Sequence, residues 1–161
     1  MTADLLDQDQ VSAAVASVMA RYARIDVLCN IAGGFRMGVP VHETADTDWN
    51  FMFDVNARTL LHAVRAVVPR MIAAGGGKIV SVAAFAAQKG AAGMGAYAAS
   101  KSAVIRLTET MAAELREKNI NVNCVLPTII DTPENRAAMP KASPKRRPAT
   151  IPVLCGIRSW A

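Results

Sequence analysis

The sequence has few of the residues that mark secreted or membrane-bound proteins. Its three cysteines are odd in number, widely separated and without any C-x-x-C pair, a usage typical of a reducing, cytoplasmic setting. No apolar run reaches the roughly 18 residues that a membrane span needs, and the acidic, polar start MTADLLDQDQ is unlike a secretory signal. We therefore expect a cytoplasmic protein that does not bind membranes.

Metal ligands and nucleic-acid-binding features are also scarce. The two histidines, His42 and His62, have no cysteine or acidic partner at ligand spacing, so we expect surface histidines and no metal site. The net charge of +5 comes from residues 141–161, which hold five of the 18 basic residues and no acid; the other 13 balance the 13 acids. A neutral body without a basic, aromatic-rich stripe excludes a nucleic-acid-binding domain.

What is present is an alternation of β-rich runs and helical periods. Apolar runs predict strands at Asp26–Asn30, Lys78–Ala84 and Ile120–Leu126. Apolar spacing predicts helices at Asp9–Tyr22, Asp48–Ala73 and Ala98–Glu117, the first with Asp7 or Asp9 as N-cap. This order is typical of an α/β fold with a parallel sheet covered on both faces. We expect one domain over residues 1–140, followed by a basic, proline-containing tail over 141–161 that neither packs nor extends the sheet.

The stretch GAYAASKSAV contains the most informative pair of residues. Tyr97 and Lys101 are four apart, so on a helix they lie on one face, one turn from each other. A nearby ammonium favours the phenolate and lowers the pKa of a phenol, which suits a tyrosine to proton transfer. The same spacing also occurs in amphipathic helices with no function, so the pair alone leaves a plain surface contact open.

Four motifs in order resemble the short-chain dehydrogenase/reductase family, over about residues 4–140. NIAG at Asn30–Gly33 is similar to its turn after the fourth strand, FDVNAR places Asn56 where the family keeps an active-site Asn, and YAASK supplies Tyr97 and Lys101. LPTIIDTP is similar to the segment after the sixth strand. The resemblance implies a Rossmann-type oxidoreductase that uses NAD or NADP on a small-molecule substrate.

The resemblance also implies a role for each matched residue. Tyr97 is expected to give or take the proton, Lys101 to bind the nicotinamide ribose and lower the tyrosine's pKa, and Asn56 to hold a water in the proton path. The other residues expected to contact the cofactor are Asp4, near the adenine, together with Asn30, Ala32, Gly33, Pro127, Ile130 and Thr132.

One departure concerns the catalytic serine. The family's serine lies 13 residues before the tyrosine, where this sequence has Ala84; neither Ser81 nor Ser100 is at that position. The dihydropteridine reductase branch also lacks this serine. The segments VLCNIAGGF, AAFAAQKGAAGMGAY and LPTIIDTPENRAAMP resemble that branch, so both a carbonyl or alcohol and a pterin-like compound stay open as substrates.

The other departure concerns the glycine-rich phosphate loop. No G-x-x-x-G-x-G or G-x-G-x-x-G follows a first strand. We therefore expect a partial Rossmann-type sheet with the fourth to sixth strands and without the first two βα units. Two hypotheses follow: an oxidoreductase that forms homo-oligomers through its two long helices, or a non-catalytic remnant that associates through the same helices.

Overall fold

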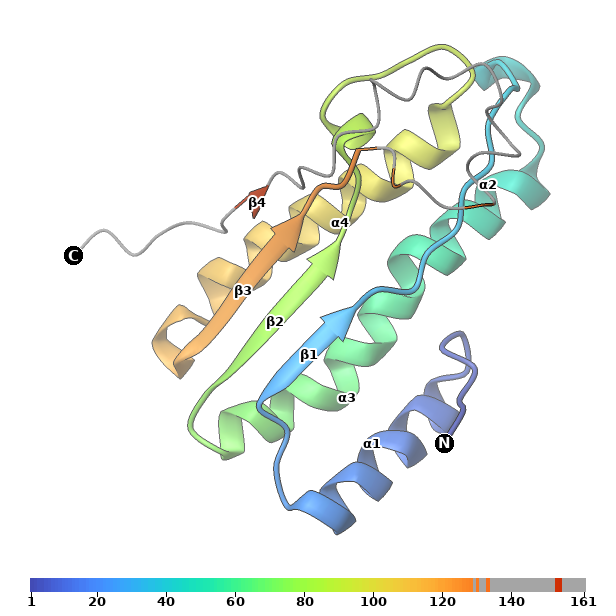
Figure 1. Ribbon diagram of the computed structural model, residues 1–161. Coiled ribbons are helices and arrows are strands. Elements are labelled where there is room, and N and C mark those ends of the chain that lie inside the picture. Colours follow the sequence, from blue (N-terminus) through green and yellow to red (C-terminus); the bar gives the residue numbers. More distant parts are fainter. Residues whose placement is uncertain (129, 131–132, 134–152, 155–161) are drawn as a thin grey trace.

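The computed structural model describes residues 1–128, 130, 133 and 153–154 (Figure 1). Its helices are α1 (Gln8–Tyr22), α2 (Asp46–Phe53), α3 (Thr59–Ala73) and α4 (Gly95–Glu114), and its strands are β1 (Val27–Asn30), β2 (Gly77–Val82), β3 (Ile120–Val125) and β4 (Val153–Leu154). A π turn, Asp54–Arg58, joins α2 to α3. The predicted alternation of strands and helices is confirmed, and the predicted outer ends differ from the observed ones by at most three residues.

The sheet has the order β1-β2-β3-β4, and its first three strands are parallel. Asn30 pairs with Ser81, and Ser81 with Cys124, so the carboxyl ends of the three strands reach the same edge. β4 pairs antiparallel with Cys124 and Val125. This two-residue strand corrects the expectation that the segment 141–161 adds nothing to the sheet; the remainder of that segment lies outside the described residues.

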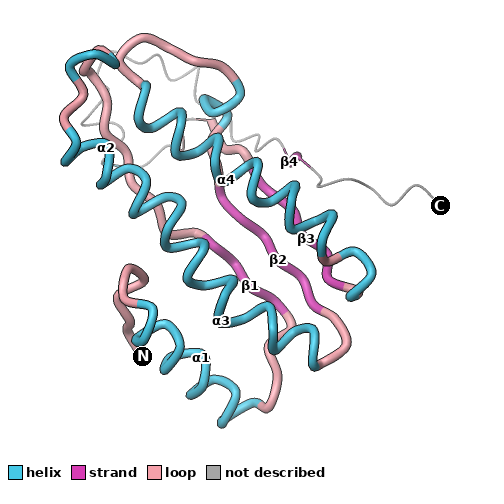
Figure 2. The backbone as a smooth tube through the Cα atoms, turned by 180° about the vertical axis from the view of Figure 1, so that it is seen from behind, coloured by secondary structure: helices cyan, strands magenta, loops and turns pink. Residues whose placement is uncertain are grey.

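The helices lie on one side of the sheet, with α3 and α4 against the strands and α1 beside α3 (Figures 1 and 2). Ile79 and Ser81 of β2 and Val122 and Cys124 of β3 point to these helices and are at most 2% exposed. Val27 belongs to β1, the edge strand of the sheet, and is 53% exposed. The expected cover on both faces is therefore not found in the part of the chain that the structure describes.

The core lies between the sheet and the helices α3 and α4. Its buried members come from the sheet, these helices and the residues next to them: Leu60, Val64, Val67, Met71, Ile79, Ala83, Val104, Ile105, Met111, Leu115, Ile120, Val122, Cys124 and Leu126.

Asp7 is the N-cap of α1. Its carboxylate accepts the amides of Gln10 and Asp9, and these bonds hold the pKa of that carboxyl below its ordinary value.

His62 differs from the surface position expected for it. Its imidazole is 8% exposed, and Nδ1 lies 3.0 Å from the Leu5 carbonyl. The sequence pattern missed this because the partner is a backbone carbonyl 57 residues away.

No helix within the described residues combines the length and the apolar character that crossing a membrane requires.

The tight connection from α3 to β2 yields a stability prediction. Gly76 has φ +150°, and a Cβ at this position would lie 2.6 Å from the Asn119 carbonyl oxygen. Because the backbone cannot move aside cheaply, Gly76→Ala should lower the free energy of unfolding by about 2 kcal/mol or more. Gly90→Ala, where nothing lies within 4 Å, is the matched control and should change it little. Urea unfolding measures both, and equal midpoints would contradict the prediction.

Candidate active site

Asn56 occupies the middle of the π turn between α2 and α3 and is 2% exposed. Its amide nitrogen donates to the Gly34 carbonyl at 3.1 Å and to Ser100 Oγ at 3.0 Å, and its amide oxygen accepts the Gly34 amide at 3.0 Å. The side chain thus joins the loop after β1 to helix α4. Single π turns inside α-helices occur frequently at functional sites.

Helix α4 carries Tyr97, Ser100 and Lys101. Lys101 is 5% exposed, and its ammonium donates to the Val82 carbonyl at the end of β2 at 2.9 Å. The Ser100 hydroxyl donates to the Tyr97 carbonyl at 2.9 Å while it accepts from Asn56. The plain surface contact left open by the spacing is excluded for Lys101, because this side chain is buried.

Burial governs the protonation of both groups of the pair. It raises the pKa of the Tyr97 phenol above its ordinary value. It lowers the pKa of the Lys101 ammonium, with a smaller opposite effect from Cys124. We expected Lys101 to lower the tyrosine's pKa. Desolvation of the phenol is instead the cause that dominates in this structure, so Tyr97 is neutral at neutral pH.

Gly33 lies where these groups converge. A Cβ on this residue would be 2.9 Å from Asn56 Oδ1 and 2.9 Å from Lys101 Nζ. Only a residue without a side chain allows the loop after β1 to come this close to both polar atoms. The structure therefore brings together Gly33, Asn56 and Lys101, three of the residues predicted from sequence.

The other predicted residues are placed less centrally. Asn30 Nδ2 donates to Ser81 Oγ at 3.3 Å, and Asn30 and Ala32 line a cavity of about 190 Å³ together with Asn56 and Leu5. Asp4, next to Leu5, is exposed, and its carboxylate accepts the Leu6 amide at 2.9 Å. Leu5 therefore brings the N-terminal segment to the end of β1.

Residues after β3 complete the predicted set. The buried Pro127 accepts the Phe85 amide through its carbonyl at 2.9 Å, which ties the end of β3 to the residue after Ala84. Ala84 itself is 6% exposed, and Ile130 is 53% exposed. Thr132 lies outside the described residues.

Several groups at the site have no counterpart in the sequence prediction. Ser100 links Asn56 to α4, and the Val82 carbonyl holds Lys101. The only signal for Ser100 is its spacing of three residues from Tyr97, which puts both on neighbouring positions of one helix face. Phe35 packs edge-on against the Tyr97 ring, with centroids 4.7 Å apart and planes at 87°.

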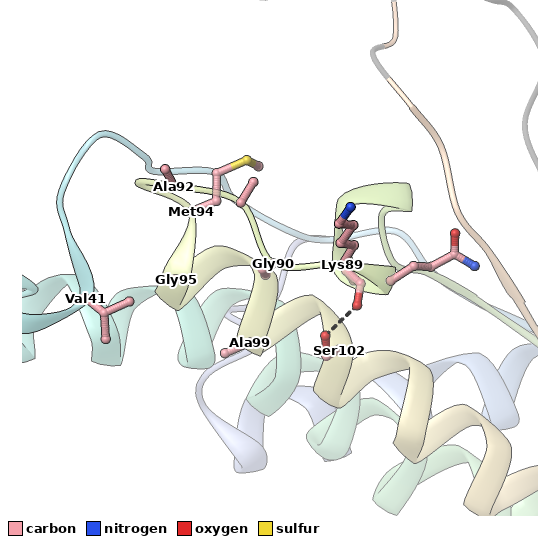
Figure 3. Close-up of a pocket in the computed structure, with 12 residues that line it drawn as sticks. Val41, Lys89, Gly90, Ala92, Met94, Gly95, Ala99 and Ser102 are labelled. Carbon is pink, nitrogen blue, oxygen red and sulfur yellow. Dashed lines mark hydrogen bonds between the residues drawn. The ribbon is translucent and has the colours of Figure 1, made fainter.

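A wider cavity, of about 640 Å³, lies between the loop 87–95 and the outer side of α4 (Figure 3). Ala98, Ala99 and Ser102 line it, whereas Tyr97 and Lys101 do not. The Ser102 hydroxyl donates to the Ala87 carbonyl at 2.7 Å and holds the loop on the helix. Its size does not make this cavity the reaction site, because the converging polar groups lie elsewhere.

Comparison with known proteins agrees with this geometry. A family model described as short chain dehydrogenase matches residues 1–143. The chain belongs to the short-chain dehydrogenase family. It is 39% identical over 139 residues to the 3-oxoacyl-(acyl-carrier-protein) reductase FabG of Thermotoga maritima, a match that covers 86% of this chain and 56% of that protein. The chain thus spans about half the length of the curated relatives it matches.

Solved structures of short-chain dehydrogenases show the same fold. An NAD⁺-bound xylitol dehydrogenase superimposes with a TM-score of 0.78 at 34% identity, covering 82% of this chain and 51% of that one. A gluconate 5-dehydrogenase from Burkholderia cenocepacia, in complex with NADP and tartrate, gives 0.80 at 31% identity, covering 87% and 54%. Short-chain dehydrogenases therefore bind NAD or NADP, and the partial Rossmann-type sheet predicted from sequence is confirmed.

The buried lysine yields a pH prediction. Because burial lowers the pKa of Lys101, the unfolded chain binds more protons than the native one between the native pKa and the unfolded value of about 10.4. The stability that the neutral amine allows is therefore fully present above about pH 10.4, and it is lost as the pH falls through the native pKa of Lys101. As the pH rises from 7 to 10, the free energy of unfolding of the unmutated chain should increase relative to that of the variant Lys101→Met, whose residue 101 cannot titrate. Denaturant unfolding measures the difference, and a constant difference would refute it.

Proposed function

We propose that this chain carries the proton-transfer side of an NAD(P)-dependent oxidoreductase that acts on a carbonyl, an alcohol or a pterin-like compound. The observation that supports this most is the close approach of Gly33 to the buried side chains of Asn56 and Lys101, the latter on the helix that carries Tyr97. Buried ionisable groups with perturbed pKa values gather at functional sites. A reducing, cytoplasmic setting stays a prediction.

Tyr97 is the proposed proton donor in reduction and acceptor in oxidation. The phenol is protonated at neutral pH and so holds the proton that reduction requires, although the raised pKa makes it a weaker acid. In the opposite direction the phenol must first lose its proton, and the positive charge of Lys101 one turn away stabilises the phenolate that forms. We therefore propose Lys101 as the activator of Tyr97.

Asn56 is proposed to hold a water in the proton path, and its contacts restrict where. Both N–H groups of the amide are used by Gly34 and Ser100, and Oδ1 already accepts the Gly34 amide. A water can therefore only donate to the free lone pair of Oδ1 or to the residue's own carbonyl. The amide also anchors the loop that carries Gly33.

The residues present fit the nicotinamide side of NAD or NADP. Among the described residues the Lys101 ammonium donates only to the Val82 carbonyl, so two of its three N–H groups suit ribose hydroxyls. Asn30, Ala32 and Gly33 border the same edge of the sheet, and the resemblance adds Pro127, Ile130 and Thr132 there and Asp4 near the adenine. The nicotinamide gives or takes the hydride. The described residues contain no glycine-rich strand–turn–helix unit for the pyrophosphate.

A second candidate is a non-catalytic protein that associates through its long helices. Four large apolar side chains on α2 and α3, Trp49, Phe51, Leu61 and Ile72, are 36–43% exposed. The outer edge of β1 is also unpaired within the described part, and exposed strand edges favour association. These surfaces suit a homo-oligomer in either candidate, so cofactor binding has to discriminate between them.

The purified 161-residue chain is expected to oligomerise, to bind NADH and NADPH more weakly than about 1 mM and to show no measurable turnover. Without helix-start amides for the pyrophosphate, several kcal/mol of binding free energy are missing, and each 1.4 kcal/mol is about tenfold in affinity. Nucleotide fluorescence, light scattering and NMR of ¹³C-labelled lysine measure these properties.

The lysine spectrum also tests the proposed function itself. The Lys101 signal should shift on nucleotide addition, and a Lys89 signal, from an exposed residue, should not. Lysine spectra unchanged at saturating nucleotide would leave the second candidate. Micromolar binding by a monodisperse sample would refute the predicted weakness.

Ala84→Ser tests which substrate class applies, in a chimera that places two βα units, the first with a glycine-rich turn, before Met1. If Ala84 is merely a serine position that has lost its hydroxyl, the variant should reduce ketones about one to three orders of magnitude faster. The reason is that one oriented hydrogen bond in a transition state contributes about 2–4 kcal/mol. We expect instead little change with quinonoid dihydropterins, as the dihydropteridine reductase resemblance implies. A large gain with pterins would refute that placement.

A further inference from the structure

His62 is a buried histidine that has no part in the proton-transfer site. It lies on α3, and its Nδ1 is 3.0 Å from the carbonyl oxygen of Leu5. A carbonyl oxygen can only accept a hydrogen bond, so Nδ1 has to carry a hydrogen for this bond to form. The contact therefore fixes the place of Leu5 and the protonated nitrogen of His62 together.

The segment that His62 contacts is a tight turn before α1. The Asp7 amide donates to the Asp4 carbonyl at 3.2 Å, and the Leu6 amide donates to the Asp4 carboxylate at 2.9 Å. These bonds close the turn on itself and do not use the carbonyl of Leu5. The turn is thus a small unit of its own, and its place on the body depends on what binds that carbonyl.

A second polar bond from this segment also ends at residue 62. Gln8 Nε2 donates to the His62 carbonyl at 3.3 Å, whereas Gln8 Oε1 is buried and has no hydrogen-bond partner within the described residues. In this part of the chain no further hydrogen bond or ion pair joins residues 4–10 to the elements after α1. The attachment has no polar bond to spare, so the loss of the imidazole bond should loosen it.

Leu5 connects this attachment to the proposed site. It lines the cavity of about 190 Å³ at the end of β1, together with Asn30, Ala32 and Asn56. Asn30 and Ala32 are proposed cofactor contacts, and Asn56 is a proposed catalytic residue. A displacement of Leu5 would therefore change the shape of the space that these three residues border.

We infer that His62 is a positioning residue whose Nδ1–H group fixes Leu5 as a wall of this cavity and thereby strengthens binding of the nicotinamide nucleotide. The inference rests on the proposed function, because that function makes the cavity part of a nucleotide site. His62 acts through Leu5, and the property that matters is its donor atom. If His62 only filled space in the core, binding would depend on the size of residue 62 and not on where it carries an N–H group.

The ring nitrogens can be examined in the unmutated protein. The chain has two histidines, and the side chain of His42 is 80% exposed, so it serves as the reference. In the ¹⁵N spectrum of histidine-labelled protein at about pH 8, where an ordinary histidine is neutral, His62 should carry its hydrogen on Nδ1 and His42 should not show this preference. A His62 ring without a hydrogen on Nδ1 would overturn the inference.

Three substitutions of His62 separate the donor atom from the size of the side chain. His62→Asn keeps an N–H group at the place of Nδ1, His62→Gln moves it to the place of Nε2, and His62→Leu removes it. The NADH concentration that shifts the ¹³C-lysine signal of Lys101 halfway, in the purified 161-residue chain, should rise several-fold for the glutamine and leucine variants. It should change little for the asparagine variant and for His42→Leu, the matched control on the exposed histidine. Circular dichroism checks that each variant is folded.

The inference and the proposed function can fail separately. If Lys101 responds to NADH equally in the unmutated chain and in the leucine variant, the oxidoreductase function stands and the positioning role is refuted. Equal weakening by the asparagine and leucine variants would refute that role as well, because the donor atom would then be irrelevant. A Lys101 signal that no concentration of NADH shifts, even in the unmutated chain, would refute the proposed function together with the nucleotide role of His62.

Discussion

The site depends on the close approach of three backbone segments at Gly33. The loop after β1, the π turn and helix α4 meet where a Cβ would come within 2.9 Å of both Asn56 Oδ1 and Lys101 Nζ. Asn56 uses both N–H groups of its amide and one lone pair of Oδ1 to hold the loop and the helix to the π turn. A side chain at position 33 would force these two polar groups apart and remove the bonds that orient them.

The burial of Lys101 is unfavourable for folding, and this is informative. An ammonium taken out of water destabilises the native state, and its lowered pKa is the signature of that cost. One carbonyl, that of Val82, is its hydrogen-bond partner within the described residues, too few for a group with three N–H donors. Local rules broken without a structural gain are typical of functional sites.

The sequence predicts the elements better than their surroundings. Strand runs and helical periods identify the three parallel strands and the helical regions of the body because they depend on local pattern, although the single helix predicted over Asp48–Ala73 is α2, a π turn and α3. The Y-x-x-x-K spacing identifies the pair on α4. The Ser100 bridge and the buried His62 depend on contacts that span 44 and 57 residues, which no local pattern encodes. The π turn was not predicted either, and the bonds from its Asn56 to Gly34 span 22 residues. The raised pKa of Tyr97 was missed for the same reason, because spacing shows a neighbouring charge but not the loss of water around the phenol.

The position of the site explains why half of a family fold can retain it. The bonds of Asn56, Ser100 and Lys101 all run between the loop after β1, the π turn, α4 and the end of β2. These segments meet at the carboxyl ends of β1 and β2. The core that supports them, between the sheet and the helices, lies within the described residues. The outer edge of β1 and the open face take no part in these bonds. The residues proposed for proton transfer are therefore positioned by segments that include no phosphate-binding unit. Their geometry is accordingly evidence for a type of chemistry, and only cofactor binding can show whether this chain performs it.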